Sequence, residues 1–262
     1  MTSPIFARIQ SSRTADDIVS QIEALILEGV LRVGDRLPGE RDLSAQFDVS
    51  RPILRNALKL LEAKGLLITR HGGGTFVADV IGEVFSKPMM DLITSHRKAA
   101  SDYLEYRREI EGIAADYAAR RATEDDRLLL RRIMTTMEQA YESNDFKREA
   151  ELDVELHNAI GECAHNIILL HTLRSCYRLL ADDVFYNRTV IYGFPGAREK
   201  LLAQHRAIFD AIMASNPAAA REAVGNHIDF IEQAQKDAAR SSAWQDVSRL
   251  RRNQREADGR RE

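Results

Sequence analysis

Four side chains in the second half of the chain have the types and the spacing of a metal site. Asp153 and His157 are four residues apart in a segment with helical periodicity, so both project from one face of a helix. His205 and His227 fall at comparable points of two later helical segments, among leucine, isoleucine and valine. Three helices could therefore bring one carboxylate and three imidazoles to a single point.

These donors indicate which ions such a site would take. Neutral imidazole nitrogens and a carboxylate oxygen favour zinc, nickel, manganese or iron over calcium, and zinc is the first expectation. Four protein ligands would leave two positions of an octahedral ion for water or for an organic acid. The alternative is that the histidines are structural or exposed, because the chain has seven of them and an Asp-x-x-x-His pair alone is a weak signal. Taken alone, the residues favour this alternative.

The elements that would position these residues are helices. Residues 97–235 show helical periodicity almost throughout, with no alternation typical of a sheet. The expected helices cover residues 104–121, 125–143, 147–164, 167–187, 198–215 and 217–239. Pro217 suits the first turn of the last helix. The second half is therefore predicted to be an all-helical bundle.

Residues 34–77 carry a second pattern, with cations on one face of a helix. Arg51, Arg55 and Lys59 recur every fourth position in a helix predicted at 51–64, where Ser50 is the N-cap and Gly65 the stop. The opposite side is apolar and must be buried. Its residues are Ile53, Leu54, Ala57, Leu58, Leu60 and Leu61.

The surrounding elements indicate what this basic helix does. A short helix at 39–47 precedes it across a tight turn, which is typical of a helix-turn-helix. Strands at 66–70 and 75–77 enclose a glycine turn and form a wing, and a helix from Thr14 to just before Gly29 completes the unit. A solvated helix beside an ordinary hairpin is the alternative, but this order of elements favours DNA binding.

Composition sets the frame for both patterns. A length of 262 residues with 44% hydrophobic residues predicts two domains. The net charge of −3 hides a local basic patch, since residues 50–71 hold five cations and one anion, Glu62. We expect a cytoplasmic protein, because no signal peptide or membrane span is apparent. Cys163 and Cys176 lack a CxxC pairing and are expected to be reduced core thiols.

The first of these patterns along the chain resembles a known family. The string LPGERDLSAQFDVSRPILRNALKLLEAKGL, followed by RHGGGTFV, is similar to the winged helix-turn-helix of the GntR family of bacterial transcription regulators, over residues 14–79. The resemblance implies that Arg41, Arg51 and Arg55 contact operator bases and phosphates, and that His71 and Gly72 approach the minor groove. We add Ser50 and Lys59 to this DNA-binding set. Gly39 replaces the usual Ser cap and Asn56 a common Glu, neither of which alters the assignment.

The second half resembles the FCD ligand-binding domain of the FadR subfamily of GntR regulators. The similar strings are YRREIEGIAADYAARRAT at 106–123, DVELHNAIGECAHN at 153–166, QHRAIFDAI at 204–212 and AAAREAVGNHI at 218–228. The resemblance implies that Asp153, His157, His205 and His227 are metal ligands and that Arg107 binds an effector carboxylate. A helix-surface ion pair between Arg107 and Glu111 is an equal alternative. Cys163 lies off the face of His157 and is expected to be core.

These observations predict a mainly α fold with four parts: a winged helix-turn-helix at 1–79, a linker at 80–96, a helical FCD domain for effector binding and dimerisation at 97–240, and a charged, disordered tail at 241–262. The predicted function is that of a homodimeric repressor of a palindromic operator, controlled by a small organic acid beside a divalent metal. The alternatives are a metal-dependent enzyme acting on a small carboxylate, or an architectural DNA-binding dimer without effector. We expect no enzyme, since no general base or nucleophile is evident near the four ligands.

Overall fold

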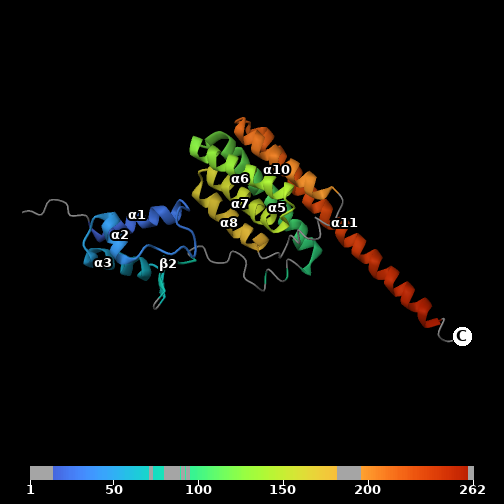
Figure 1. The fold of residues 1–262 in the computed structure, drawn as a ribbon, viewed down its shortest axis with the longest axis horizontal. Helices are drawn as coiled ribbons and strands as arrows, with labels where there is room; N and C mark the ends of the chain where they lie inside the picture. Colours follow the sequence, from blue (N-terminus) through green and yellow to red (C-terminus); the bar gives the residue numbers. More distant parts are fainter. Residues whose placement is uncertain are drawn as a thin grey trace, which may run out of the picture. The chain divides into compact units, whose positions relative to one another are not determined.

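The chain forms two compact units, Met1–Gly82 and Glu83–Glu262 (Figure 1). The structure is a computed structural model that describes residues 14–70, 73–79, 89, 92, 95–181 and 196–258. His71, Gly72, most of the predicted linker and the predicted helical residues 182–187 lie outside the described residues. No described helix is both long and apolar enough to cross a membrane.

The N-terminal unit has three helices followed by a two-stranded hairpin, in the order expected from the sequence. Its elements are α1 (Ala15–Leu27), α2 (Glu40–Phe47), α3 (Arg51–Ala63), β1 (Leu67–Arg70) and β2 (Gly74–Val77). The strands pair antiparallel, with Leu67 opposite Val77 and Arg70 opposite Gly74. Asp48, in the left-handed conformation at φ 52°, ends α2 and makes the tight turn into α3.

Local signals and one small core hold this unit together. A capping box starts α1, because the Thr14 N–H donates to Asp17 Oδ2 at 2.8 Å and the Asp17 N–H donates to Thr14 Oγ1 at 3.4 Å. One face of α1 and one face of α3 then meet over the hairpin. The buried residues include Ile18, Ile22, Leu54, Leu61, Leu67 and Val77. This packing leaves the other side of α3 in solvent.

Two details of α3 differ from the prediction. Leu60 was expected in the buried stripe, yet it is 38% exposed, and Ile53 is half-buried. With 3.6 residues per turn, Leu54, Leu58 and Leu61 face the core while Leu60 lies at the edge of the stripe. Ser50 occupies the N-cap position, but its side chain makes no capping hydrogen bond.

The C-terminal unit is a helical bundle, as expected. Its described helices are α5 (Arg97–Arg121), α6 (Glu124–Glu142), α7 (Phe146–Cys163), α8 (Ile167–Ala181), α10 (Ala197–Met213) and α11 (Pro217–Asp258). Four alanines of α5 (Ala114, Ala115, Ala118 and Ala119) are at most 1% exposed and let neighbouring helices approach closely, while large aliphatic side chains fill the remaining space. The core includes Ala115, Ala118, Leu130, Leu152, Leu156, Ile208, Ile212 and Ile228.

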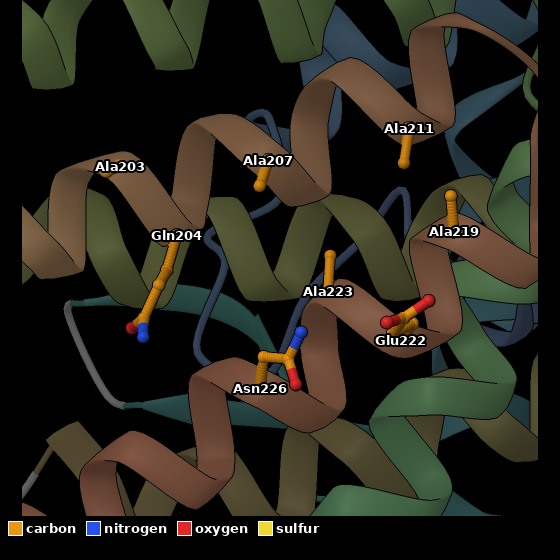
Figure 2. Close-up of a pocket in the computed structure, with 8 residues that line it drawn as sticks. All are labelled: Ala203, Gln204, Ala207, Ala211, Ala219, Glu222, Ala223 and Asn226. Carbon is orange, nitrogen blue, oxygen red and sulfur yellow. The ribbon is translucent and has the colours of Figure 1, made fainter.

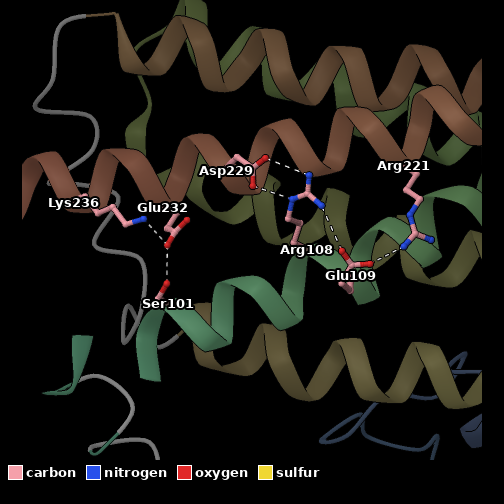
Figure 3. A network of polar contacts seen from close by, with 7 residues as sticks. All are labelled: Ser101, Arg108, Glu109, Arg221, Asp229, Glu232 and Lys236. Carbon is pink, nitrogen blue, oxygen red and sulfur yellow. Dashed lines mark hydrogen bonds and ion pairs between the residues drawn. The ribbon is translucent and has the colours of Figure 1, made fainter. Parts of the chain in front are cut away.

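Helices α5 and α11 lie along each other and are joined at the surface by polar contacts (Figure 3). Arg108 Nε donates to Asp229 Oδ1 at 2.9 Å, and Arg221 Nη2 donates to Glu109 Oε2 at 2.7 Å. Glu232 accepts from Ser101 at 2.7 Å. Exposed ion pairs contribute little stability each, so these contacts chiefly set the register of the two helices.

The C-terminal tail differs from the prediction of disorder. Helix α11 continues through residue 258, a length of 42 residues. The physical reason is that a helix already formed within the bundle extends at little cost, and the sequence has no glycine or proline between Gly225 and Gly259. Trp244 and Leu250 on this extension are exposed, and residues 259–262 lie outside the described residues.

The cap of α6 provides a test of the bundle. The Thr123 N–H donates to Asp126 Oδ2 at 2.7 Å, and Thr123 Oγ1 accepts from the Asp126 N–H at 3.2 Å. Thr123→Ala should therefore destabilise the protein by about 1 kcal/mol and lower its melting temperature by a few degrees in calorimetry. Thr136→Ala is the control, because Thr136 lies inside the same helix and bonds only the Arg132 carbonyl. Equal melting temperatures for the two variants would contradict the role of the cap.

Candidate metal centre and nucleic-acid interface

The structure brings together the four residues singled out as metal ligands. One donor atom from each of Asp153, His157, His205 and His227 lies within 4.8 Å of the others, and all four side chains are buried. Asp153 and His157 are one turn apart on α7, His205 is on α10, and His227 is on α11. The bundle thus gathers residues that are up to 74 positions apart in the sequence, from Asp153 to His227.

The geometry of this cluster fits a cation. The Nε2 atoms of His157, His205 and His227 are buried, and no described residue gives them a hydrogen-bond partner. His205 Nε2 lies 3.0 Å from Asp153 Oδ1. Two donors at about 2.1 Å from one ion are about 3 Å apart in adjacent octahedral positions. Because buried polar atoms without partners are rare, a bound ion is the simplest way to satisfy three nitrogens at once.

Two of the imidazoles are held from behind in the orientation a metal needs. His157 Nδ1 lies 2.9 Å from Glu111 Oε2, and His227 Nδ1 lies 3.2 Å from Gln204 Oε1. Both partners are oxygen acceptors, so each Nδ1 carries the proton and each Nε2 keeps its lone pair for the centre. Burial, with the nearby His205 and His157, holds the pKa of His227 well below its ordinary value, which maintains the neutral form that metals bind.

Arg107 and Glu111 do form an ion pair, but it is buried rather than on the helix surface. Arg107 Nε donates to Glu111 Oε1 at 2.6 Å, and each side chain is 2% exposed. Burial alone would raise the pKa of Glu111, but the positive charge of Arg107, together with the contacts that Arg107 and His157 make to the carboxylate, outweighs burial and lowers that pKa to about 2. Among the described residues, the Arg107 side chain makes no other hydrogen bond.

Aromatic side chains surround this polar group. The Tyr177 ring lies 5.8 Å from the His157 ring, and the Tyr103 hydroxyl donates to the Cys176 carbonyl at 3.0 Å. Burial raises the pKa of Tyr177 well above its ordinary value, so its hydroxyl stays protonated. Cys163 is fully buried, and burial raises the pKa of its thiol to about 12, which agrees with its assignment to the core.

Sequence reasoning missed Glu111 and Gln204 as supports of the histidines. Gln204 also lines a groove of about 400 Å³ between α10 and α11, whose other lining residues are mostly alanines (Figure 2). Its position directly before His205 was a weak signal for a role near the centre. For Glu111, the only signal in the sequence was its spacing of four residues from Arg107. Its contact with His157 joins α5 to α7, and sequence spacing does not reveal such a contact.

The predicted DNA-binding residues lie on the exposed side of the N-terminal unit. Arg51, Arg55 and Lys59 are exposed on α3, and Arg41 is exposed on α2. Arg55 Nε pairs with Glu40 Oε2 at 2.7 Å, and Arg41 Nε pairs with Asp42 Oδ1 at 3.2 Å. Because these pairs are solvent-exposed, they can be exchanged for phosphate or base contacts at small cost. The predicted wing-tip residues His71 and Gly72 are not among the described residues.

Comparison with known proteins identifies the class of this architecture. Residues 14–77 match the family model for bacterial regulatory proteins of the gntR family, and residues 102–230 match the model for the FCD domain. A winged helix-turn-helix followed by this helical domain defines a DNA-binding transcription regulator, not an enzyme. The chain belongs to the GntR family, with an FCD domain as its second half.

Individual relatives agree over most of the chain. The putative L-lactate dehydrogenase operon regulatory protein of Escherichia coli K12 is 37% identical over 228 residues, which are 86% of this chain and 87% of the relative. The Glc operon transcriptional activator of the same strain is 31% identical, covering 82% of this chain and 86% of the relative. The structure of Streptococcus agalactiae GntR has a TM-score of 0.52 at 28% identity, covering 84% of this chain and 99% of that one.

The donor set predicts that a divalent metal stabilises the protein. Adding Zn²⁺ in excess over its dissociation constant should raise the melting temperature, and a chelator should reverse this, because only the folded chain assembles the four ligands. Asp153→Ala should abolish stoichiometric zinc, measured by elemental analysis and by thermal shift. Asp116→Ala is the control, since Asp116 is a carboxylate of α5 that pairs with Arg120. Undiminished zinc binding in the Asp153 variant would contradict the assignment.

Proposed function

We propose that this regulator is a homodimeric repressor in the cytoplasm whose affinity for a palindromic operator is set by a small 2-hydroxy acid bound beside a divalent metal. The observation that carries the proposal is the convergence of Asp153, His157, His205 and His227 at one buried point. An architectural DNA-binding dimer would have no use for three buried imidazole nitrogens that lack a hydrogen-bond partner among the described residues.

Two features support a hydroxy acid as the effector. The first is that a relative 37% identical to this chain is named for an L-lactate dehydrogenase operon. The second is the open Nη fork of Arg107, because a guanidinium offers two parallel donors to a carboxylate. A bound metal would supply an electrophile for the carboxylate and hydroxyl oxygens. Arg107 would orient the acid, while the surrounding tyrosines limit access of water.

The N-terminal unit supplies the output. Arg51 and Arg55 point away from the core of α3, where they can read base edges in a major groove, and Arg41 and Lys59 can contact phosphates. Ser50, His71 and Gly72 complete the proposed DNA-binding set. Two copies related by a two-fold axis would place their two α3 helices in half-sites one turn of the DNA helix apart.

Control by the effector requires a difference between two arrangements of the dimer. A ligand shifts an equilibrium only by its differential affinity for the two states. The acid would therefore bind one spacing of the DNA-binding units better than the other, and the operator would favour the opposite spacing. An effector that saturates the FCD domain without changing operator affinity would contradict this coupling.

Arg55 tests the DNA-binding surface. An operator is first selected from a random DNA pool with the wild-type protein. Arg55→Ala should then weaken binding by about 1–3 kcal/mol and relax the base preference at one position of each half-site, in fluorescence anisotropy at fixed salt. Arg131→Ala is the control, because Arg131 forms a surface pair with Glu124 in the other unit. The proposal for Arg55 fails if both variants bind like the wild type.

Arg107 tests the effector site. With zinc bound, L-lactate should change the operator dissociation constant of the wild type. Arg107→Lys keeps the charge beside Glu111 but loses the two-pronged donor, so the affinity for lactate in calorimetry should fall about tenfold. The matched control is Arg108→Lys, the neighbouring residue that pairs with Asp229 on the surface. Equal lactate affinity in the two variants would remove Arg107 from the site.

A further inference from the structure

We propose that Glu111 is a positioning residue that joins the metal centre to the effector arginine. One of its carboxylate oxygens fixes the proton and the orientation of His157, and the other aims Arg107. This inference rests on the proposed function, because it assigns to one buried side chain the contact between the metal and the effector. It leaves the proposed metal ligands and the proposed DNA-contacting residues as they are.

The contacts of Glu111 divide between its two oxygens. Oε1 accepts from Arg107 Nε at 2.6 Å, and Oε2 lies 2.9 Å from His157 Nδ1. The three side chains are 2–3% exposed, so water does not compete for either contact. Arg107 and Glu111 are on α5, whereas His157 is on α7. Glu111 is thus the bridge by which α5 reaches the metal-binding helix.

The chemistry of a carboxylate explains why this position suits Glu. An ionised carboxylate only accepts hydrogen bonds, and both of its neighbours, the guanidinium of Arg107 and the imidazole of His157, have N–H groups that can donate. With Nδ1 of His157 donating, the Nε2 lone pair faces the other three ligands. Gln204 does the same for His227 with an amide oxygen, but among the described residues it makes no bond to a cation. Glu111 alone among the described residues links a predicted ligand to a buried arginine.

The two contacts of one rigid group cannot vary independently. A turn of the carboxylate that follows His157 also moves the oxygen that holds Arg107. The direction of the Arg107 fork therefore depends on how His157 is placed, and His157 is placed by the ion. Metal occupancy should consequently raise the affinity for L-lactate, through a coupling that is reciprocal.

The decisive variant is Glu111→Gln. An amide has one accepting oxygen and one donating nitrogen, so one of the two donors must face an N–H group. We expect Zn²⁺ affinity, measured by competition with a chromogenic chelator, to fall about ten- to a hundredfold, as for other residues that orient a ligand from behind. Asp116→Asn is the matched control on the same helix, where a half-buried carboxylate pairs with an exposed arginine four residues on. Its zinc affinity should not change.

A double variant distinguishes a positioning role of Glu111 from a purely structural role. Adding Arg107→Met to Glu111→Gln removes the buried cation, so the amide oxygen is free to turn to His157 Nδ1. Zinc affinity should then return to within about threefold of the wild type, while lactate affinity stays lost. The double variant also leaves no unpaired buried charge. It therefore provides a test even if Glu111→Gln alone fails to fold. A double variant no better than a folded Glu111→Gln would overturn the inference.

The wild type gives an independent test without mutation. Long-range ¹⁵N–¹H spectra of histidine-labelled protein should show His157 in the Nδ1–H form, both without metal and with Zn²⁺ bound. An Nε2–H form in the metal-free protein, or wild-type zinc affinity in folded Glu111→Gln, would refute the role of Glu111. If instead the wild type binds no zinc, or lactate leaves operator affinity unchanged, it is the proposed function that fails.

Discussion

The buried ion pair of Arg107 and Glu111 sets the conditions for the rest of the helical domain. Removing two charges from water costs several kcal/mol per ion unless they are paired and hydrogen-bonded. At 2.6 Å and 2% exposure, this pair meets the first requirement, and His157 Nδ1 lies 2.9 Å from the second oxygen of the carboxylate. Helices α5 and α7 must therefore keep one fixed separation. The alanines of α5 make that separation short enough for the contact.

Around this pair the domain combines an apolar shell with a polar centre. Leucines and isoleucines of α6, α7, α10 and α11 form the shell, and the four donor residues lie within it. An apolar core tolerates small shifts of its helices, but imidazoles that share one point do not. The centre therefore selects one arrangement of α7, α10 and α11 among those that the hydrophobic residues alone would permit. Such selectivity would suit the ligand control that we propose for this domain.

The sequence predicted elements well and cross-helix contacts poorly. Caps such as Thr14 and stops such as Gly65 are local, so the helices and the hairpin follow from them. The spacing of Asp153 and His157 is also local. The contact of Glu111 with His157 depends on how two helices pack, which no spacing encodes. Arg107 had two interpretations, and the structure assigns its Nε to the ion pair, whereas its Nη atoms make no hydrogen bond to the residues that the structure describes. Leu60 and the extension of α11 differ from the prediction because both depend on tertiary context. Burial of Leu60, at the edge of the apolar stripe, depends on its neighbours, and the extension of α11 grows from a segment that is already packed.

The length of α11 connects the proposed metal centre to a distant part of the protein. His227 lies in its packed part, and the same uninterrupted helix ends at Asp258. At about 1.5 Å per residue, the distance between these two residues along the axis is roughly 46 Å. If the helix stays straight, a tilt of about 5° at His227 would displace its far end by about 4 Å. A small change at the proposed metal centre would thus be amplified into a displacement as large as a side chain. The exposed Trp244 lies on the part of α11 that such a tilt would displace.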